Sequence, residues 1–176
     1  MTIYLVRHAP TASNHGGVFM GQSDDPAVEV ESPETFRVPR GRPRTLYSSP
    51  LTRALSAVAV MFPGEHAIIS DLLLERSVGE WEDLDHATVE SRWPGTFIDG
   101  VIDPYAIPPG GETVDDLCDR VRAFFAALDH DDDVYAVTHN GWIRAAMLLN
   151  GEIDRDNLFA DPVPFLTPIR FAPSFD

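Results

Sequence analysis

Four short, continuously apolar segments alternate with segments of helical periodicity, and this alternation constrains the fold of the chain more than any other feature. The segments are rich in β-branched, aliphatic and aromatic residues and span 2–6, 45–47, 66–69 and 134–138. Runs of this length without alternating polar residues are typical of strands buried on both faces, as in a parallel sheet. The pattern therefore predicts an α/β fold: a doubly wound, mostly parallel sheet with helices on both faces.

The helical periodicity places helices between and after these strands. We expect them at residues 51–61, 86–92, 112–128 and 142–149. For the first of them, Ser48 or Ser49 is the expected N-cap, with Pro50 at the first helical position. Residues 165–171 predict an edge strand that Pro168 interrupts.

Two regions show neither helical nor strand periodicity over more than a few residues. Residues 9–43 are rich in glycine and proline and are expected to form one long loop region. Residues 79–111 combine aromatic residues with glycine and proline, which predicts a lid or insertion with at most a short helix. The whole chain, 1–176, is expected to form a single domain.

The charge of the chain excludes several classes of function. The formal net charge is −15, which disfavours non-specific binding to nucleic acid or to an anionic membrane. All 13 basic residues are arginine, so a Walker P-loop and Schiff-base chemistry, which need lysine, are excluded. Arginine is a planar donor suited to bidentate contact with phosphate or carboxylate.

Cysteine content and hydropathy bear on the compartment. Cys118 is the single cysteine, so an intramolecular disulfide cannot form, which fits a reducing cytosol. The first residues lack a basic targeting region, and no apolar stretch approaches the ~20 residues of a membrane span. We therefore expect a cytoplasmic protein.

Side chains capable of chemistry follow the predicted strands. Arg7 and His8 end the first strand, Arg53 lies in the first turn after the second, Glu75 follows the third, and His139 ends the fourth. Singly, each has an ordinary structural explanation as a polar residue leaving the core or on a solvated surface. Together they predict a site, because ligands of such sheets bind beyond the carboxyl ends of the parallel strands.

Two arginines, two imidazoles and the helix N-terminus after His139 predict a pocket for a dianionic phosphoryl group without a metal. His8 is the expected nucleophile, because nearby arginines lower its pKa and favour the neutral imidazole. Glu75 would hold a proton for the departing alcohol oxygen, which the neighbouring Leu72–Leu74 and Trp81 would favour.

Six blocks of sequence resemble a known family, the histidine phosphatase or phosphoglycerate-mutase-like superfamily, and in particular its phosphatase branch. They occur in family order between residues 2 and about 150. The blocks are Arg7-His8-Ala9-Pro10-Thr11-Ala12-Ser13-Asn14, Gly21-Gln22-Ser23-Asp24-Asp25-Pro26, Tyr47-Ser48-Ser49-Pro50-Leu51-Thr52-Arg53-Ala54, Leu74-Glu75-Arg76-Ser77-Val78-Gly79-Glu80-Trp81-Glu82, Pro109-Gly110-Gly111-Glu112-Thr113 and Val137-Thr138-His139-Asn140-Gly141-Trp142-Ile143-Arg144.

The resemblance implies a role for each matching residue. His8 would be the phosphorylated nucleophile and Glu75 the acid and base. The residues expected to hold the phosphoryl oxygens are Arg7, Asn14, Arg53 and His139. The family works without a metal or an organic cofactor. Further residues expected near the substrate are Gln22, Arg76, Trp81, Trp93, Tyr105 and Glu112, of which the aromatic ones either stack on the leaving group or simply pack.

The chain departs from the family pattern in two respects. Ala9 and Asn140 stand where glycine is common, and residues 26–43 lack the periodicity of the helix that usually covers one sheet face there. We expect that helix to be shortened or missing. A bare apolar face would be exposed, so another subunit is a candidate cover and a homodimer is expected.

The predicted activity is that of a metal-independent phosphomonoester phosphatase acting through a phosphohistidine intermediate on a small phosphorylated metabolite. Two alternatives remain open: a phosphoglycerate-type mutase, and a non-catalytic binder of phosphorylated ligands on the same fold. The sequence does not select among α-ribazole phosphate, a sugar phosphate and phosphoserine as the substrate.

Overall fold

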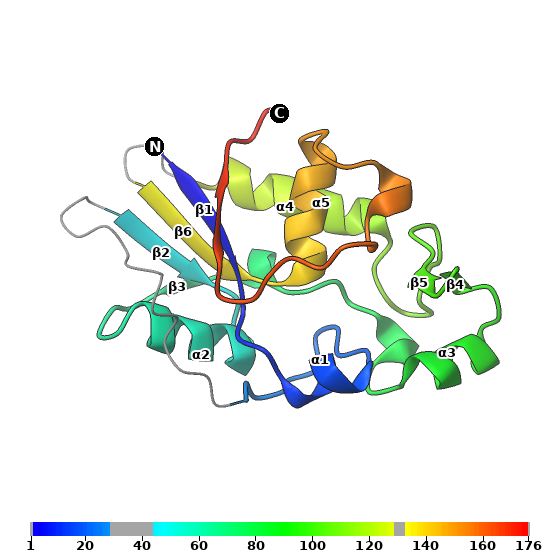
Figure 1. Ribbon diagram of the computed structural model, residues 1–176. Coiled ribbons are helices and arrows are strands. Elements are labelled where there is room, and N and C mark those ends of the chain that lie inside the picture. The colour runs from blue at the N-terminus through cyan, green and yellow to red at the C-terminus, as the bar shows by residue number, and fades with distance from the viewer. Residues whose placement is uncertain (1, 29–43, 129–132, 176) are drawn as a thin grey trace.

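A five-stranded sheet runs through the centre of the computed structural model, which describes residues 2–28, 44–128 and 133–175 (Figure 1). The strand order is β3-β2-β6-β1-β7, and all pairs are parallel except β1 with β7, which is antiparallel. The strands are β1 (Ile3–Arg7), β2 (Arg44–Ser48), β3 (Ile68–Ile69), β6 (Asp133–Thr138) and β7 (Pro168–Phe171). The predicted doubly wound, mostly parallel sheet is confirmed.

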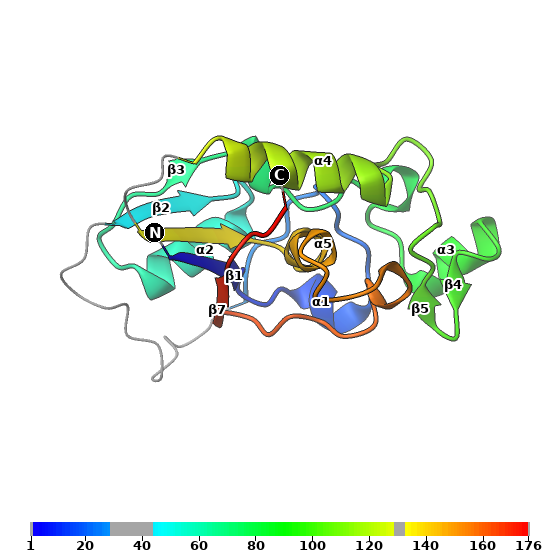
Figure 2. The same ribbon diagram turned by 90° about the horizontal axis from the view of Figure 1, so that it is seen from above.

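Helices cover both faces of this sheet because successive side chains of the strands point to opposite sides. On one side, Ile3 and Leu5 of β1 pack with α4 (Val114–Ala126) and α5 (Asn140–Leu149). On the other side, Val6 and Leu46 pack against α2 (Thr52–Met61). Figures 1 and 2 show the same separation, with α2 and α4 on opposite sides of the strands.

The helix α4 illustrates why the sequence folds this way. Its buried side chains recur every three or four residues and face the sheet: Val114, Leu117, Cys118, Val121, Phe124 and Phe125. Thr113 caps its N-terminus by accepting a hydrogen bond from the backbone N–H of Asp116, whose carboxylate accepts from the Thr113 N–H in return. Burial of Cys118 agrees with its predicted place in the core.

Residues 79–111 lie beyond the carboxyl ends of the strands, at one end of the molecule (Figures 1 and 2). They contain the predicted short helix α3 (His86–Arg92), together with a small hairpin that the sequence did not predict. The remaining elements of this segment are the 3₁₀ helix η2 (Gly79–Trp81) and the hairpin strands β4 (Phe97–Ile98) and β5 (Val101–Ile102).

Two local predictions are wrong. The predicted loop region 9–43 contains a short helix, α1 (Ala12–Gly16), which Thr11 and Asn14 cap reciprocally. The helix α2 begins at Thr52, one residue later than expected. Its N-cap residue is Leu51 rather than Ser48 or Ser49, and the Leu51 side chain cannot accept a capping hydrogen bond. Instead, the Asp24 carboxylate accepts hydrogen bonds from the Thr52 N–H and hydroxyl. The predicted absence of a helix at 26–43 falls almost wholly on residues 29–43, outside the described residues.

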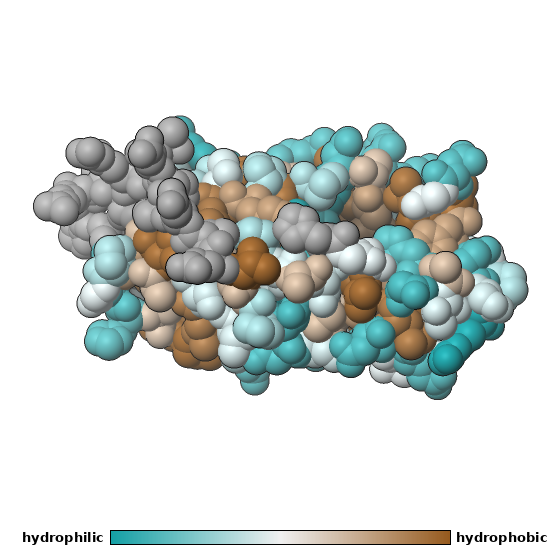
Figure 3. All heavy atoms as spheres, turned by 60° about the horizontal axis from the view of Figure 1, so that its bottom comes forward, coloured by the Kyte–Doolittle hydropathy of each residue, from teal (hydrophilic) through white to brown (hydrophobic). Residues whose placement is uncertain are grey.

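The exposed large apolar side chains of the described residues are Val28, Leu55, Ile68, Ile69, Ile98, Tyr105 and Ile107. Figure 3, in which the underside of Figure 1 comes forward, shows hydrophobic and hydrophilic residues interspersed outside the grey atoms. The homodimer therefore stays a prediction.

Within the described ranges, no helix is both long and apolar enough to span a membrane. The 3₁₀ helices η1 (Asp71–Leu73) and η3 (Arg155–Asn157) complete the described elements.

Candidate active site

A cavity of about 330 Å³ opens beyond the carboxyl ends of the parallel strands, where the sequence predicted a site. Its polar residues come from the end of β1, from α1, from the first turn of α2, from the chain at 75–76 and from the start of α5. The polar lining is Arg7, His8, Ser13, Asn14, Arg53, Glu75, Arg76 and Asn140. The apolar and aromatic lining includes Phe19, Met20, Val78, Trp81, His86, Ile102 and Phe159.

A hydrogen bond defines the tautomer of His8, which lines the cavity. Its Nδ1 lies 2.5 Å from the Ala9 carbonyl oxygen, a contact that requires Nδ1 to carry the proton and donate it. Nε2 therefore carries a free lone pair. Burial lowers the pKa of His8 to about 3, and the positive charges of Arg53 and Arg7 add to that effect. The expected neutral imidazole is thus supported, although burial contributes more than the arginines do.

Arg7 reaches the cavity from the last position of β1. It is 8% exposed, its Nη1 donates to the Val163 carbonyl at 2.6 Å, and its guanidinium lies 3.7 Å from the centre of the Phe165 ring. Its Nε is buried and has no hydrogen-bond partner among the residues that the structure describes. A buried, unsatisfied donor beside His8 fits an anionic ligand at this position.

Arg53 is held by the loop that follows α1. Its Nη2 donates to the Gly21 carbonyl at 2.7 Å and its Nη1 to the Ser23 carbonyl at 2.8 Å. The Glu82 carboxylate holds the same loop by accepting from the Gln22 N–H and the Ser23 hydroxyl. The loop therefore fixes the direction of the Arg53 guanidinium.

His139 lies behind His8 and is absent from the cavity lining. The two rings are 5.1 Å apart between centroids. The Nδ1 of His139 accepts from Arg53 Nε at 3.3 Å, so Nε2 carries the proton and donates to the Ser49 hydroxyl at 2.8 Å. Burial lowers the pKa of this histidine well below its usual range. Its predicted direct contact with the phosphoryl group stays a prediction, because both ring nitrogens have protein partners here.

Glu75 occupies the N-terminus of α5. Its carboxylate accepts from the backbone N–H groups of Arg76, Gly141 and Trp142 at 2.9, 3.0 and 3.2 Å. Backbone donors are therefore present beside the predicted neighbour Trp81, which lines the same cavity, and two N–H groups of the helix start expected to bind phosphate are bonded to Glu75 instead. A Cβ at position 141 would lie 2.6 Å from a Glu75 oxygen, so the glycine permits this close approach.

The main chain around Glu75 is held by one ion pair, Glu112 with Arg120 of α4. The two side chains are joined twice, at 2.9 and 2.8 Å. Arg120 also donates to the carbonyls of Leu74, at 2.5 Å, and of Glu75, at 3.1 Å, while Glu112 accepts from the Ser77 N–H at 2.7 Å. We refer to Glu112 and Arg120 as the Glu75 clamp. Glu112 was expected near the substrate, but it contacts this main chain and is absent from the cavity lining.

Only some of the other residues expected near the substrate line the cavity. Arg76 and Trp81 line the cavity, whereas Gln22, Trp93 and Tyr105 do not. Gln22 donates to the Glu75 carbonyl, Trp93 packs 6.4 Å from Trp81, and the exposed Tyr105 donates to Asp156. Asn14 lines the cavity, and its carboxamide oxygen caps α1 by accepting from the Thr11 N–H.

Several contributors were missed by the sequence reasoning. Val163 and Phe165 hold Arg7, and Ser49, predicted as an N-cap, holds His139. The Asn140 side chain accepts from the Val163 N–H at 2.8 Å and so ties the start of α5 to the Arg7 contact. No local pattern signals these contacts, because each joins residues far apart in the chain.

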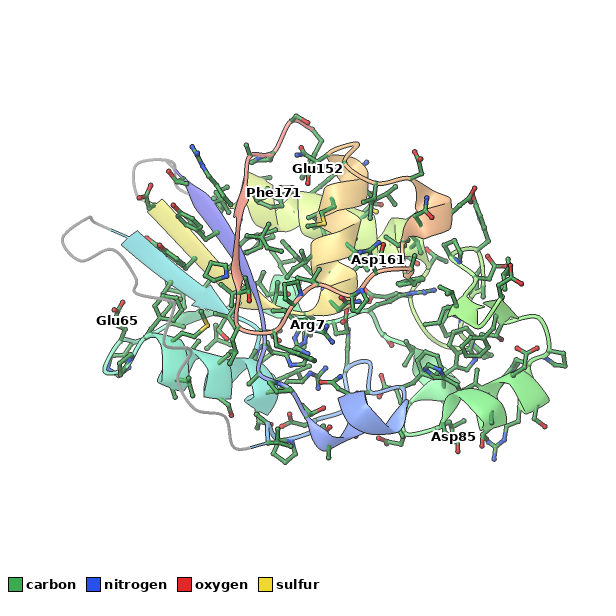
Figure 4. All side chains as sticks on the ribbon, viewed as in Figure 1. Arg7, Glu65, Asp85, Glu152, Asp161 and Phe171 are labelled. Carbon is green, nitrogen blue, oxygen red and sulfur yellow. The ribbon has the colours of Figure 1, made fainter. Side chains whose placement is uncertain are left out.

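The charges of the site differ from those of the surface. Figure 4 shows Arg7 inside the molecule, whereas the labelled carboxylates of Glu65, Asp85 and Glu152 lie at the periphery. The net charge of −15 therefore does not describe the cavity, where three arginines are buried. Among the described residues, no group of three or more histidine, cysteine, aspartate or glutamate side chains is arranged to hold a metal ion.

A histidine with an unprotonated Nε2, buried arginines and a carboxylate thus lie together at one edge of the sheet of this α/β protein. The family model of the histidine phosphatase superfamily, branch 1, matches residues 3–164. The chain therefore belongs to the histidine phosphatase superfamily.

Relatives of similar sequence are named as phosphatases, and solved structures share the fold. The metal-independent phosphoserine phosphatase of Arabidopsis thaliana is 32% identical, over 83% of this chain and 67% of its own. The glucosyl-3-phosphoglycerate phosphatase of Mycolicibacterium vanbaalenii is 26% identical, over 86% of this chain and 76% of its own. The structure of a mycobacterial glucosyl-3-phosphoglycerate phosphatase with VO3 superposes with a TM-score of 0.72 at 21% identity, covering 97% of this chain and 92% of that one. The α-ribazole phosphatase of Shigella flexneri gives 0.70 at 20%, covering 96% and 88%.

Proposed function

We propose that this protein is a phosphomonoester phosphatase that acts through a phosphohistidine at His8 on a small phosphorylated metabolite. The observation that carries the proposal is the His8 tautomer: Nδ1 donates to the Ala9 carbonyl, which leaves Nε2 unprotonated in the wall of a cavity that Arg7 and Arg53 also line. The relatives named as phosphatases of phosphoserine and of glucosyl-3-phosphoglycerate support a small phosphomonoester as the substrate class.

The chemistry follows from this arrangement. Nε2 of His8 attacks phosphorus, the bond from phosphorus to the ester oxygen breaks, and the Glu75 carboxylic acid protonates the departing alcohol. Arg7 and Arg53 balance the charge on the phosphoryl oxygens. Water then attacks the phosphohistidine while Glu75 takes its proton, and phosphate leaves with His8 restored. No metal is needed in this sequence of steps.

A panel of phosphomonoesters, assayed for released phosphate with and without a chelator, tests the proposal. We expect chelator-resistant release from at least one small metabolite, and an acid-labile, alkali-stable phosphoenzyme when the reaction is quenched. Isomerisation of phosphoglycerate without phosphate release would establish the mutase alternative. Binding of phosphorylated ligands without turnover would establish the non-catalytic alternative.

A further inference from the structure

Asn140 is the first residue of α5, and its side chain lines the cavity while only one end of its carboxamide is bonded to the protein. Its Oδ1 accepts from the Val163 N–H at 2.8 Å. A backbone N–H can only donate, so this contact assigns the oxygen to the Val163 side and Nδ2 to the other side. Among the described residues, nothing accepts a hydrogen bond from Nδ2. Both N–H bonds of the carboxamide are therefore open to a ligand of the cavity.

Asn14 has the same arrangement in another part of the cavity wall. Of the described residues that line the cavity, Asn14 and Asn140 are the two that carry a carboxamide. The Oδ1 of Asn14 accepts from the Thr11 N–H at 3.1 Å, and in the described part of the chain nothing accepts from its Nδ2. In each case a main-chain N–H holds the oxygen, so the nitrogen is left for a hydrogen-bond acceptor from outside the protein.

Two carboxamides outside the cavity lining use their nitrogen instead. The Nδ2 of Asn150, at the other end of α5, donates to the Glu152 carboxylate at 2.6 Å and to the Ala172 carbonyl at 3.1 Å. The Nε2 of Gln22 donates to the Glu75 carbonyl at 3.1 Å. Free amide nitrogens thus occur where the cavity could supply their partner.

Asn140 belongs to the part of the cavity formed by Arg7 and His8, the phosphoryl end. It directly follows His139, whose ring centroid is 5.1 Å from that of His8. Val163, which holds the Asn140 oxygen, also accepts from Arg7 Nη1 at 2.6 Å through its carbonyl. Asn140 and Arg7 are therefore bonded to the same residue, and both line the cavity.

The other donors expected on this side of the phosphoryl group are already used. Both ring nitrogens of His139 have protein partners. The backbone N–H groups of Gly141 and Trp142, at the start of α5, donate to Glu75. A phosphoryl group has several oxygens that each accept hydrogen bonds. The Asn140 carboxamide supplies donors at the place where the main chain of the helix no longer does.

We propose that Asn140 is a phosphoryl-binding residue, whose Nδ2 donates to a phosphoryl oxygen of the substrate while Val163 holds its carboxamide oxygen. Glycine is common at this position of the family pattern, so the donor is a property of this chain. The inference rests on the proposed phosphatase function and adds one binding residue to its phosphoryl end.

Two variants separate the proposed donor from the contact with Val163. Asn140→Asp keeps an oxygen for the Val163 N–H and loses the donor, whereas Asn140→Gly loses both and adds no charge. In both variants the dissociation constant of inorganic phosphate, measured by calorimetry, should rise at least about 10-fold. The value of kcat/KM should fall about 10- to 100-fold, the range of a hydrogen bond to a charged group. Asn157→Asp adds the same charge at an exposed site outside the cavity lining and should keep the wild-type values.

A pair of substrates separates binding of the phosphoryl group from a displacement of Glu75. Every phosphomonoester offers the same phosphoryl oxygens, so p-nitrophenyl phosphate and glycerol 3-phosphate should lose kcat/KM within about threefold of each other. A displaced Glu75 would instead impair glycerol 3-phosphate much more, because its alcohol needs a proton to leave. That outcome in Asn140→Gly would overturn the inference.

The remaining outcomes are distinguishable. Wild-type phosphate affinity in Asn140→Asp, together with a loss in Asn140→Gly, would overturn the inference, since the Val163 contact alone would then explain the loss. Wild-type affinity in both variants would overturn it as well, and hydrolysis of p-nitrophenyl phosphate would leave the phosphatase function intact. If the wild type binds inorganic phosphate but hydrolyses no phosphomonoester, the proposed function fails, while the calorimetric comparison still decides the role of Asn140.

Discussion

The two ends of the cavity are built in different ways. At the phosphoryl end, Arg7 and His8 follow directly from β1, and Arg53 lies in the first turn of α2. At the leaving-group end, Phe19, His86 and the ring of Phe159 come from a loop, from α3 and from the chain beyond α5. The strand ends fix the positions of the residues at the phosphoryl end. The leaving-group end depends on packing between segments far apart in sequence, so the two ends should respond differently to substitution.

The largest effect is expected from His8→Ala. Loss of the nucleophile should lower kcat/KM by roughly 10⁴-fold or more while the protein stays folded. The control is His66→Ala, an exposed histidine outside the cavity lining, which should behave as wild type. Hydrolysis rates and thermal melting check both variants. Near-wild-type turnover by His8→Ala would mean that the phosphoryl end does not supply the nucleophile.

The Glu75 clamp holds the main chain of the expected proton donor, so Arg120→Gln should impair the leaving-group end more than the phosphoryl end. Without Arg120, the Glu75 main chain loses its hydrogen bonds to α4, so proton donation to the leaving group is impaired. Alkyl phosphates, whose alcohols need that proton, should lose roughly 100-fold in kcat/KM. p-Nitrophenyl phosphate, whose phenolate leaves readily, should lose much less.

Equal losses on both substrates would assign a merely structural role to Arg120. The melting temperature of the variant, measured in parallel, separates a loss of folded protein from a loss of rate. Arg122→Gln is the matched control, since Arg122 of the same helix is exposed and forms its ion pair with Asp119, far from the Glu75 main chain.

The buried histidines of the phosphoryl end predict the pH dependence of stability. His8 and His139 have lowered pKa values in the folded protein, so the unfolded chain binds more protons below about pH 6.5. His8 should therefore reduce the free energy of unfolding by about 2 kcal/mol between pH 7 and pH 5, and His139 should act in the same direction. Urea denaturation at both pH values measures this, and in His8→Asn the loss of stability between them should be about 2 kcal/mol smaller than in the wild type. An unchanged dependence in that variant would exclude a buried, neutral His8.

The smallest effect is expected at the leaving-group end. The His86 ring is tilted against the rings of Phe19 and Phe97, with centroid distances of 4.7 and 5.1 Å, and it lines the cavity. In His86→Ala, the KM for the preferred substrate should rise about 3- to 10-fold with little change in kcat, because the lost contact is made equally before and during reaction. Tyr105→Phe removes only the hydroxyl contact with Asp156 and should alter neither constant. A large effect of Tyr105→Phe would extend the site to this part of 79–111.

The same division explains which predictions succeeded. The order of strands and helices, and the presence of Arg7, His8, Arg53 and Glu75 at one edge, follow from short apolar runs that each end on a polar residue. A residue next to a strand end has little freedom of position. The hairpin β4–β5 and the helix α1 were missed because each is too short to show a period.

The predicted substrate residues were less accurate for a related reason. Trp93, Tyr105 and Glu112 lie in aromatic or family-like blocks, yet none of them lines the cavity. Their side chains contact Trp81, Asp156 and Arg120 instead. Composition indicates that a residue can bind a ligand, but it does not indicate which neighbour already occupies that side chain.

The sequence by itself determined the class of fold, the arginine-only basic side chains and the residues that meet at the strand ends, because these depend on residue type and on distance from a strand end. The tertiary structure decided which nitrogen of His8 is unprotonated, and that backbone N–H groups of α5 hold Glu75. These properties depend on contacts with residues remote in the chain. Hydrogen bonds have strict limits of distance and direction, so only the packed structure can select among the partners that the sequence offers.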